Sequence, residues 1–293
     1  MKILVLLLLS FLTILSQPNI KIESDTSKVN FHIETLSIGL TIDSCSSEGI
    51  EMFPSDRIFP KFYADGTVHQ TSLSKNTYTR RYIGSLGGVQ KILQFYFKKK
   101  LVQLSMGATV YSSLVRQPDI LEVQTAGYFV DFHVDMKLSE SFILRSGYGH
   151  YSAHLVDDGL SVLQIESINY AKDYFPVLLA YNNNAIKTSF YGGFRFDTYT
   201  IPEKNKRWNF QIGFQGGDFQ LTNYMKLYGA VDIKFKQEVA FATTQSYQIG
   251  LKFWEQGSSA IRFAYTYRTG IEDRGQFYKN RVSLSLVSLY FDF

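Results

Sequence analysis

Apolar and polar residues alternate with a period of two through most of the chain from Thr67 onward. In Met225–Lys236 the odd positions are apolar or glycine, whereas the even positions include Lys226, Asp232 and Lys234. Side chains of a β-strand point alternately to its two faces. The pattern therefore predicts a strand with one apolar face and one charged face.

Repeated strands of this kind predict an all-β fold that crosses a membrane. Charged side chains at mid-strand are typical of the wet inner face of a transmembrane barrel and rare in a soluble sandwich. Short turns also alternate with longer connections, as in bacterial outer-membrane barrels. We expect a transmembrane antiparallel up-and-down β-barrel of about 12 strands. Its segments are expected near 67–84, 89–98, 101–115, 121–135, 142–155, 164–181, 185–198, 207–216, 224–236, 244–254, 259–270 and 279–293.

The C-terminal segment carries a further signal of this class. Val287, Leu289, Phe291 and Phe293 place an apolar residue at every second position, and the chain stops on the aromatic. This resembles the C-terminal signature that the barrel-assembly machinery of the bacterial outer membrane reads. The assembly machinery is therefore an expected partner, through Phe293.

The N-terminal part of the chain differs from the barrel region. The apolar run Ile3–Leu9 and the residues that follow it are shorter than the roughly 20 residues of a spanning helix. They predict a secretory signal peptide at 1–16. Residues 17–66 show no sustained alternation, and we expect them to form a periplasmic lead-in segment before a barrel at 67–293. Cys45 is the single cysteine, so the chain has no internal disulfide.

Composition narrows the expected partners. The chain holds 24 Phe and 20 Tyr, yet its formal net charge is only +4. So mild a charge gives no argument for nucleic acid. We expect outer-membrane lipids, either phospholipid or lipopolysaccharide, as partners, and a homodimer is left open.

The stretch 147–158, GYGHYSAHLVDD, gathers candidate catalytic groups within a chain that has only five histidines. His150 and Ser152 are two apart on a predicted strand, so they point the same way with Cα atoms roughly 6.5–7 Å apart. Parity places both on the lipid-facing side near the outer end of that strand. His150 would act as general base for a Ser152 nucleophile that attacks a lipid ester.

Two further elements complete this hypothesis. A hairpin centred near residue 160 would bring Asn169 beside His150, where its amide would hold the imidazole tautomer. A neutral amide suits a lipid face, on which an ionised carboxylate is expensive. Asp157 and Asp158 follow in the loop and could bind a Ca²⁺ ion that stabilises the oxyanion, because calcium prefers oxygen ligands.

The pair His150-x-Ser152 on the outer face of such a barrel resembles outer-membrane phospholipase A, with an amide on the adjoining strand. Lipid A deacylase barrels have a similar His-x-Ser with a Glu. The third member of those sites lies closer in sequence to the serine than Asn169 does, and Gln164 stands nearest to the equivalent position. The resemblance implies hydrolysis of a lipid ester at the outer leaflet.

The chain also resembles a family of bacterial outer-membrane proteins known only as a domain of unknown function. That resemblance covers most of 57–293 and implies location more than activity. It rests on Arg57-Ile58-Phe59-Pro60, Ala64-Asp65, Gly149–Asp158, Ile168-Asn169-Tyr170 and Tyr191-Gly192-Gly193.

Two alternatives to the hydrolase stay open. His and Tyr are ordinary residues of a barrel's outer rim, where amphipathic rings sit at headgroup level. A metal site at His150 and His154 is disfavoured, because residues four apart on a strand stand about 13 Å apart. If these residues only belong to the rim, the chain is a non-enzymatic barrel, either a narrow pore or a structural envelope protein. Its lumen is then lined by charged side chains such as Lys226, Asp232 and Arg262.

Overall fold

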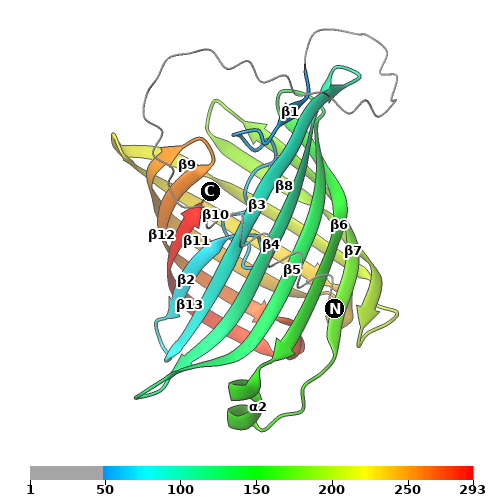
Figure 1. Ribbon diagram of the computed structural model, residues 1–293. Helices are drawn as coiled ribbons and strands as arrows, with labels where there is room; N and C mark the ends of the chain where they lie inside the picture. The colour runs from blue at the N-terminus through cyan, green and yellow to red at the C-terminus, as the bar shows by residue number, and fades with distance from the viewer. Residues whose placement is uncertain (1–48, 293) are drawn as a thin grey trace, which may run out of the picture. The chain divides into compact units, whose positions relative to one another are not determined.

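The computed structural model describes residues 49–292, and within them twelve long antiparallel strands close into a barrel (Figure 1). Each strand pairs with its neighbours in the chain, and β13 pairs with β2 to complete the ring. The strands are β2 (Thr71–Asn76), β3 (Arg81–Phe97), β4 (Lys100–Arg116), β5 (Leu121–Lys137), β6 (Phe142–Leu155), β7 (Tyr170–Asn183), β8 (Thr188–Ile201), β9 (Trp208–Thr222), β10 (Met225–Lys236), β11 (Ala242–Gln256), β12 (Ser259–Ile271) and β13 (Arg281–Asp292).

The remaining elements are short. The two-residue strand β1 (Glu51–Met52) pairs with β3, and helix α2 (Asp157–Leu163) lies in the β6–β7 connection. The 3-10 turns η1 (Gln237–Val239) and η2 (Gly275–Phe277) lie in the β10–β11 and β12–β13 connections. No helix among residues 49–292 is long and apolar enough to cross a membrane. The predicted all-β barrel of about 12 strands is confirmed.

The two ends of the barrel differ in their connections. One end carries the short turns 98–99, 138–141, 184–187, 223–224 and 257–258. The other carries 77–80, 117–120, 156–169, 202–207, 237–241 and 272–280. We call these the short-turn end and the long-loop end. The alternation that the sequence predicts is therefore present, and longer loops are the outward-facing ones in outer-membrane barrels.

The first hairpin is the place where the predicted boundaries fail. Segments 67–84 and 89–98 were expected, whereas the strands are β2 and the long β3, with the turn at 77–80. Gly87 and Gly88 resemble a turn in the sequence but lie inside β3. A Cβ atom added at Gly87 would lie 2.2 Å from the carbonyl oxygen of Ala108 on β4. The glycine therefore permits a close approach of two strands, not a turn.

This close approach yields a prediction on stability. Gly87→Ala should lower the free energy of unfolding by about 1–3 kcal/mol, because a backbone atom blocks the added methyl group. Gly229→Ala on β10 is the matched control, since the nearest atom to its added Cβ is 3.9 Å away. Urea titrations of both variants in detergent measure the difference. Equal behaviour of the two variants would contradict the account.

Side chains sort by parity as the alternation predicts. On β12 the even positions Arg262, Ala264 and Thr266 are buried in the lumen, whereas Phe263 and Tyr265 are exposed on the outside. Burial here means enclosure within the barrel. The large apolar side chains on the outside form a surface suited to acyl chains. Examples from six strands are Phe132, Leu179, Phe190, Ile212, Ile249 and Leu289.

A stretch of chain before β2 lies inside the barrel. Residues 53–70 pass from β1 into the lumen and return to the start of β2 (Figure 1). Phe59 is 1% exposed, and the Phe62 ring stacks on Tyr191 of β8 at 3.7 Å. We call residues 53–70 the lumenal segment. The periplasmic lead-in segment that the sequence predicts over 17–66 includes residues that lie inside the barrel, such as Phe59, Phe62 and Ala64. The signal peptide at 1–16 and residues 17–48 lie outside the described residues.

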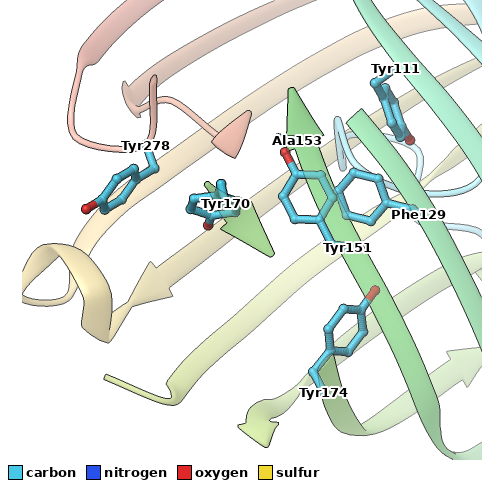
Figure 2. Close-up of a cluster of buried hydrophobic side chains, with 7 residues drawn as sticks. All are labelled: Tyr111, Phe129, Tyr151, Ala153, Tyr170, Tyr174 and Tyr278. Atoms are coloured by element: carbon cyan, nitrogen blue, oxygen red, sulfur yellow. The ribbon is translucent and has the colours of Figure 1, made fainter. Parts of the chain in front are cut away.

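An aromatic cluster fills the lumen toward the long-loop end (Figure 2). Phe129 and Tyr151 are stacked with ring centres 3.8 Å apart, and Tyr170 lies between Tyr151 and Tyr278. The hydroxyl of Tyr151 accepts a hydrogen bond from the backbone N–H of Gly275 in η2. The cluster therefore ties the β12–β13 connection to the barrel wall.

Candidate functional site

The candidate catalytic pair lies on the outer face of β6 near the long-loop end. The odd positions Gly149, Tyr151 and Ala153 are buried, so His150 and Ser152 point outward, His150 being exposed. β6 starts at the short-turn end and ends at Leu155, five residues beyond His150. The structure therefore places both residues on one side of the strand, in its half toward the long-loop end.

The residue opposite His150 is an aspartate. Asp173 of β7 pairs in register with His150, and Ser152 pairs with Ala171. The Nδ1 atom of His150 lies 2.6 Å from Oδ1 of Asp173, with side chains 46% and 28% exposed. A carboxylate at Nδ1 fixes the tautomer of an imidazole and leaves Nε2 to accept a proton. This is the contact that a general base requires.

Asn169 does not occupy the position that the sequence suggested for it. It lies one residue before the first residue of β7 and is exposed, with no hydrogen-bond partner for its side chain among residues 49–292. The predicted hairpin centre near residue 160 is too early, because the connection includes α2 and the register pairs residue 150 with 173. Asp173 has the same outward parity as Phe175, so that signal was present in the sequence.

The two aspartates proposed to bind calcium are the first two residues of α2. Asp157 is exposed. The described part of the chain contains no group of three or more His, Cys, Asp or Glu side chains that could hold a metal ion. Ca²⁺ takes about six to eight oxygen ligands, so the described residues give the expected ion no complete ligand set.

The second candidate site is the lumen, where ion pairs join the lumenal segment to the wall. Lys61 pairs with Asp292 of β13 at 2.6 Å, and Asp65 pairs with Lys234 of β10 at 2.5 Å. His69 contacts Asp131 of β5 at 2.5 Å between Nε2 and Oδ2. These contacts reach strands on several sides of the barrel. The lumenal segment is therefore attached by ion pairs at spread-out points, in addition to the packing of Phe59 and Phe62 against the wall.

A cavity of about 140 Å³ remains beside the lumenal segment. Its lining runs from Arg57 and Arg145 to Lys236 and Asp273 by the long loops. Five cations and three aspartates line it, so its walls are cationic. They are Arg57, Arg145, Arg195, Lys234 and Lys236 with Asp65, Asp131 and Asp273.

Two loop carboxylates show how the long-loop end is held together. Hydrogen bonds from Lys279 and Tyr278 keep the pKa of Glu203 below its usual value. Burial alone would raise the pKa of Asp273, but Lys234 and Lys236 outweigh it and lower the value. Both carboxylates are therefore ionised at neutral pH. Glu203 joins the β8–β9 connection to the β12–β13 connection, and Asp273 joins the β12–β13 connection to strand β10.

These features define the class of the protein. A closed antiparallel barrel with an apolar exterior, a charged interior and alternating short and long connections is an integral membrane β-barrel of the bacterial outer-membrane type. Within that class the chain belongs to a family described as "Protein of unknown function (DUF1207)", whose model matches residues 50–293. No curated protein matches the chain.

Solved structures with a similar arrangement of strands are outer-membrane proteins. The outer membrane protein OprD from Pseudomonas aeruginosa aligns at 8% identity with a TM-score of 0.34, over 83% of this chain and 97% of OprD. OccAB3 from Acinetobacter baumannii aligns at 8% identity with a TM-score of 0.30, over 73% of each chain. Likeness at this level carries no argument on the activity of this chain.

Proposed function

We propose that the protein is a narrow passage in the outer membrane that the lumenal segment closes, and that it favours small anions. The observation that supports this proposal is the attachment of residues 53–70 to the wall through ion pairs at Lys61, Asp65 and His69. Water can replace such polar contacts when the segment moves, so that the apolar surface newly exposed is limited to the cluster around Phe59 and Phe62.

The charge of the cavity beside the lumenal segment supports a preference of the passage for anions over cations. Cations exceed carboxylates along its lining, and a wall of one sign raises the local concentration of ions of the opposite sign. A structural barrel without transport needs neither an excess of cations along such a cavity nor ion pairs between its plug and its wall.

Planar-bilayer recordings of the full chain test the passage. Under a KCl gradient the reversal potential should show a preference for chloride, with long closed periods. Absence of conductance at every voltage, both in the wild type and in variants that loosen the lumenal segment, would overturn the proposal.

A second candidate function is hydrolysis of a lipid ester on the outer face. The specific observation in its favour is the 2.6 Å contact between His150 Nδ1 and Asp173 Oδ1, two residues from Ser152. Ser152 would attack the ester carbonyl while His150 takes its proton, and Asp173 would stabilise the imidazolium. His150 would give that proton to the departing alcohol, and water would then release the fatty acid from Ser152. Asp173 is partly exposed near the start of β7 at the long-loop end, and at headgroup level its charge would cost less than at the bilayer centre.

Substitutions separate the residues of this second candidate. Ser152→Ala should lower fatty-acid release from phospholipid or lipopolysaccharide micelles by on the order of 10³-fold or more. Asp173→Asn should also lower kcat strongly, because a carboxamide supports the wrong tautomer of the imidazole. Ser146→Ala, on the same face of β6, is the matched control. Unchanged release from Ser152→Ala would exclude the hydrolase, and an effect of Asn169→Ala in place of Asp173→Asn would restore the amide as third member.

A further inference from the structure

Positive charge is in excess around one part of the lumen. Four cationic side chains surround two carboxylates near the short-turn end. The cations are Arg57, Lys61, Arg145 and Arg262, and the carboxylates are Asp135 and Asp292. If every pair formed, two positive charges would still lack a counterpart among the groups of this cluster. Unpaired charge in a confined site is expensive.

The two carboxylates are already occupied. Asp135 receives a two-pronged contact from Arg145, with Nε 2.6 Å from Oδ1 and Nη2 2.7 Å from Oδ2. Asp292 is held by Arg262 through both of its oxygens and by Lys61 as well. Both carboxylates are therefore already paired with cations through both of their oxygens.

Arg57 is the cation without a counterpart. Its side chain has no hydrogen bond or ion pair among residues 49–292, although the charges of Arg145, Asp135 and Asp292 all act on it. It is partly buried and lines the 140 Å³ cavity. A guanidinium that presents its donors to a cavity is the group that binds oxyanions through two parallel hydrogen bonds.

Two other donors point to the same cavity. The Nη1 group of Arg145 has no hydrogen-bond partner in the described residues, and the arginine is held in place by Asp135 and by the Phe59 ring at 4.1 Å. Nδ1 of His133 is buried and also lacks a partner there. Arg57, Arg145 and His133 all line the cavity, and both arginine charges act on the histidine.

The acidic residues of the cavity do not cancel this arrangement. Asp65 is engaged by Lys234, Asp131 by His69 through Oδ2, and Asp273 by Lys236. The cavity also has room, since one water takes up about 30 Å³ in the liquid, which is well below the 140 Å³ available. The cavity that Arg57 lines therefore has room, taken as a whole, for an ion the size of phosphate or sulfate.

We propose that Arg57, Arg145 and His133 form a binding site for a small oxyanion inside the barrel, at the point where the lumenal segment meets β5 and β6. The site rests on the proposed function in one respect, since the bound anion would be an ion on its way through the passage. It also adds regulation, because an anion held between Arg57 of the segment and Arg145 of the wall fastens the closed state.

Thermal unfolding of the full chain in detergent tests the site with inorganic phosphate as the probe, at constant ionic strength. The Tm of the wild type should rise and then saturate as phosphate increases, because a ligand that binds only the folded state stabilises it. Arg57→Gln should weaken this binding about 10- to 100-fold, the value of hydrogen bonds to a charged group. Arg116→Gln is the matched control, since Arg116 is exposed at the opposite end of the barrel.

Each outcome has a defined meaning. Phosphate also stabilises proteins without binding a site, but that effect is equal in all three proteins and does not saturate. Equal curves for the wild type and Arg57→Gln would overturn the site. If Arg57→Gln fails to fold, Arg57→Lys replaces it and should bind phosphate less tightly than the wild type, since the charge remains and the fork is lost. Saturable binding without any conductance would reject the passage alone and keep the anion site.

Discussion

The double variant Lys61→Gln/Asp65→Asn is expected to conduct steadily in a planar bilayer, where the wild type stays closed for most of the recording. The two substitutions remove the ion pairs that tie the lumenal segment to Asp292 of β13 and Lys234 of β10. The partner charges then remain in the lumen and gain water when the segment leaves. The substitutions therefore destabilise the closed state, which loses its ion pairs, and leave the open state stabilised by the hydration of the remaining charges.

The size of the effect follows from the burial of these pairs. The side chains of Lys61 and Asp292 are 14% and 3% exposed, and those of Lys234 and Asp65 are 12% and 7% exposed. Removing one partner of a buried pair costs about 3–5 kcal/mol. Even about 3 kcal/mol corresponds to a change on the order of 100-fold in the ratio of open to closed molecules.

The matched control is Lys137→Gln/Glu140→Gln. This pair, at 2.8 Å, joins the end of β5 to the turn before β6, with side chains 33% and 88% exposed. The control also removes one cation and one anion, but it leaves the lumenal segment untouched. Its conductance should equal that of the wild type, and steady currents from the control would show that they arise from general loosening of the barrel.

The barrel could be predicted because each of its strands is marked by a pattern of neighbouring residues. Each strand has one face against lipid and one against water, so alternation at neighbouring positions suffices to identify it. In β10 the predicted charged positions Asp232 and Lys236 are buried in the lumen, as expected. The bounds of β3 could not be predicted, because Gly87 allows β3 to lie close to β4, and that contact is not visible in the sequence of β3 alone.

The lumenal segment could not be predicted, because its contacts are distant in sequence. Lys61 and Asp292 are 231 residues apart, and Asp65 and Lys234 are 169 apart. Nothing periodic marks residues 53–66, since the wall surrounds them on all sides. The available signal was their composition, in which aromatic and charged residues are too closely mixed for a solvated linker.

In the outer-face site, too, the local feature could be predicted from the sequence and the feature that depends on a second strand could not. Parity placed His150 and Ser152 on the outside of β6, since it depends on one strand only. The partner of His150 depends on the register between β6 and β7, and the length of the connection with α2 sets that register. The predicted register differs from the observed one by four residues, so the sequence predicts Asn169 beside His150 where the structure has Asp173.

Arg262→Ala is expected to lower the free energy of unfolding by about 3–5 kcal/mol, as is found when one partner of a buried ion pair is removed. Arg262 is fully buried, with Nε 2.6 Å from Oδ2 of Asp292 and Nη1 3.0 Å from the hydroxyl of Tyr228. Its guanidinium also lies 4.4 Å from the ring centre of Tyr63, in the lumenal segment. The substitution therefore weakens both the wall and the attachment of the segment.

Urea titration of the barrel in lipid vesicles measures this change. Arg281→Ala is the matched control, because Arg281 is exposed at the first residue of β13 and should shift the free energy by less than about 0.5 kcal/mol. Arg262→Lys should fall between the two, since it keeps the charge beside Asp292 but loses the two-pronged contact. If Arg262→Ala were as stable as Arg281→Ala, the lumenal ion pairs would contribute nothing to stability, and the force that holds the lumenal segment would have to be its aromatic contacts, such as Phe62 on Tyr191.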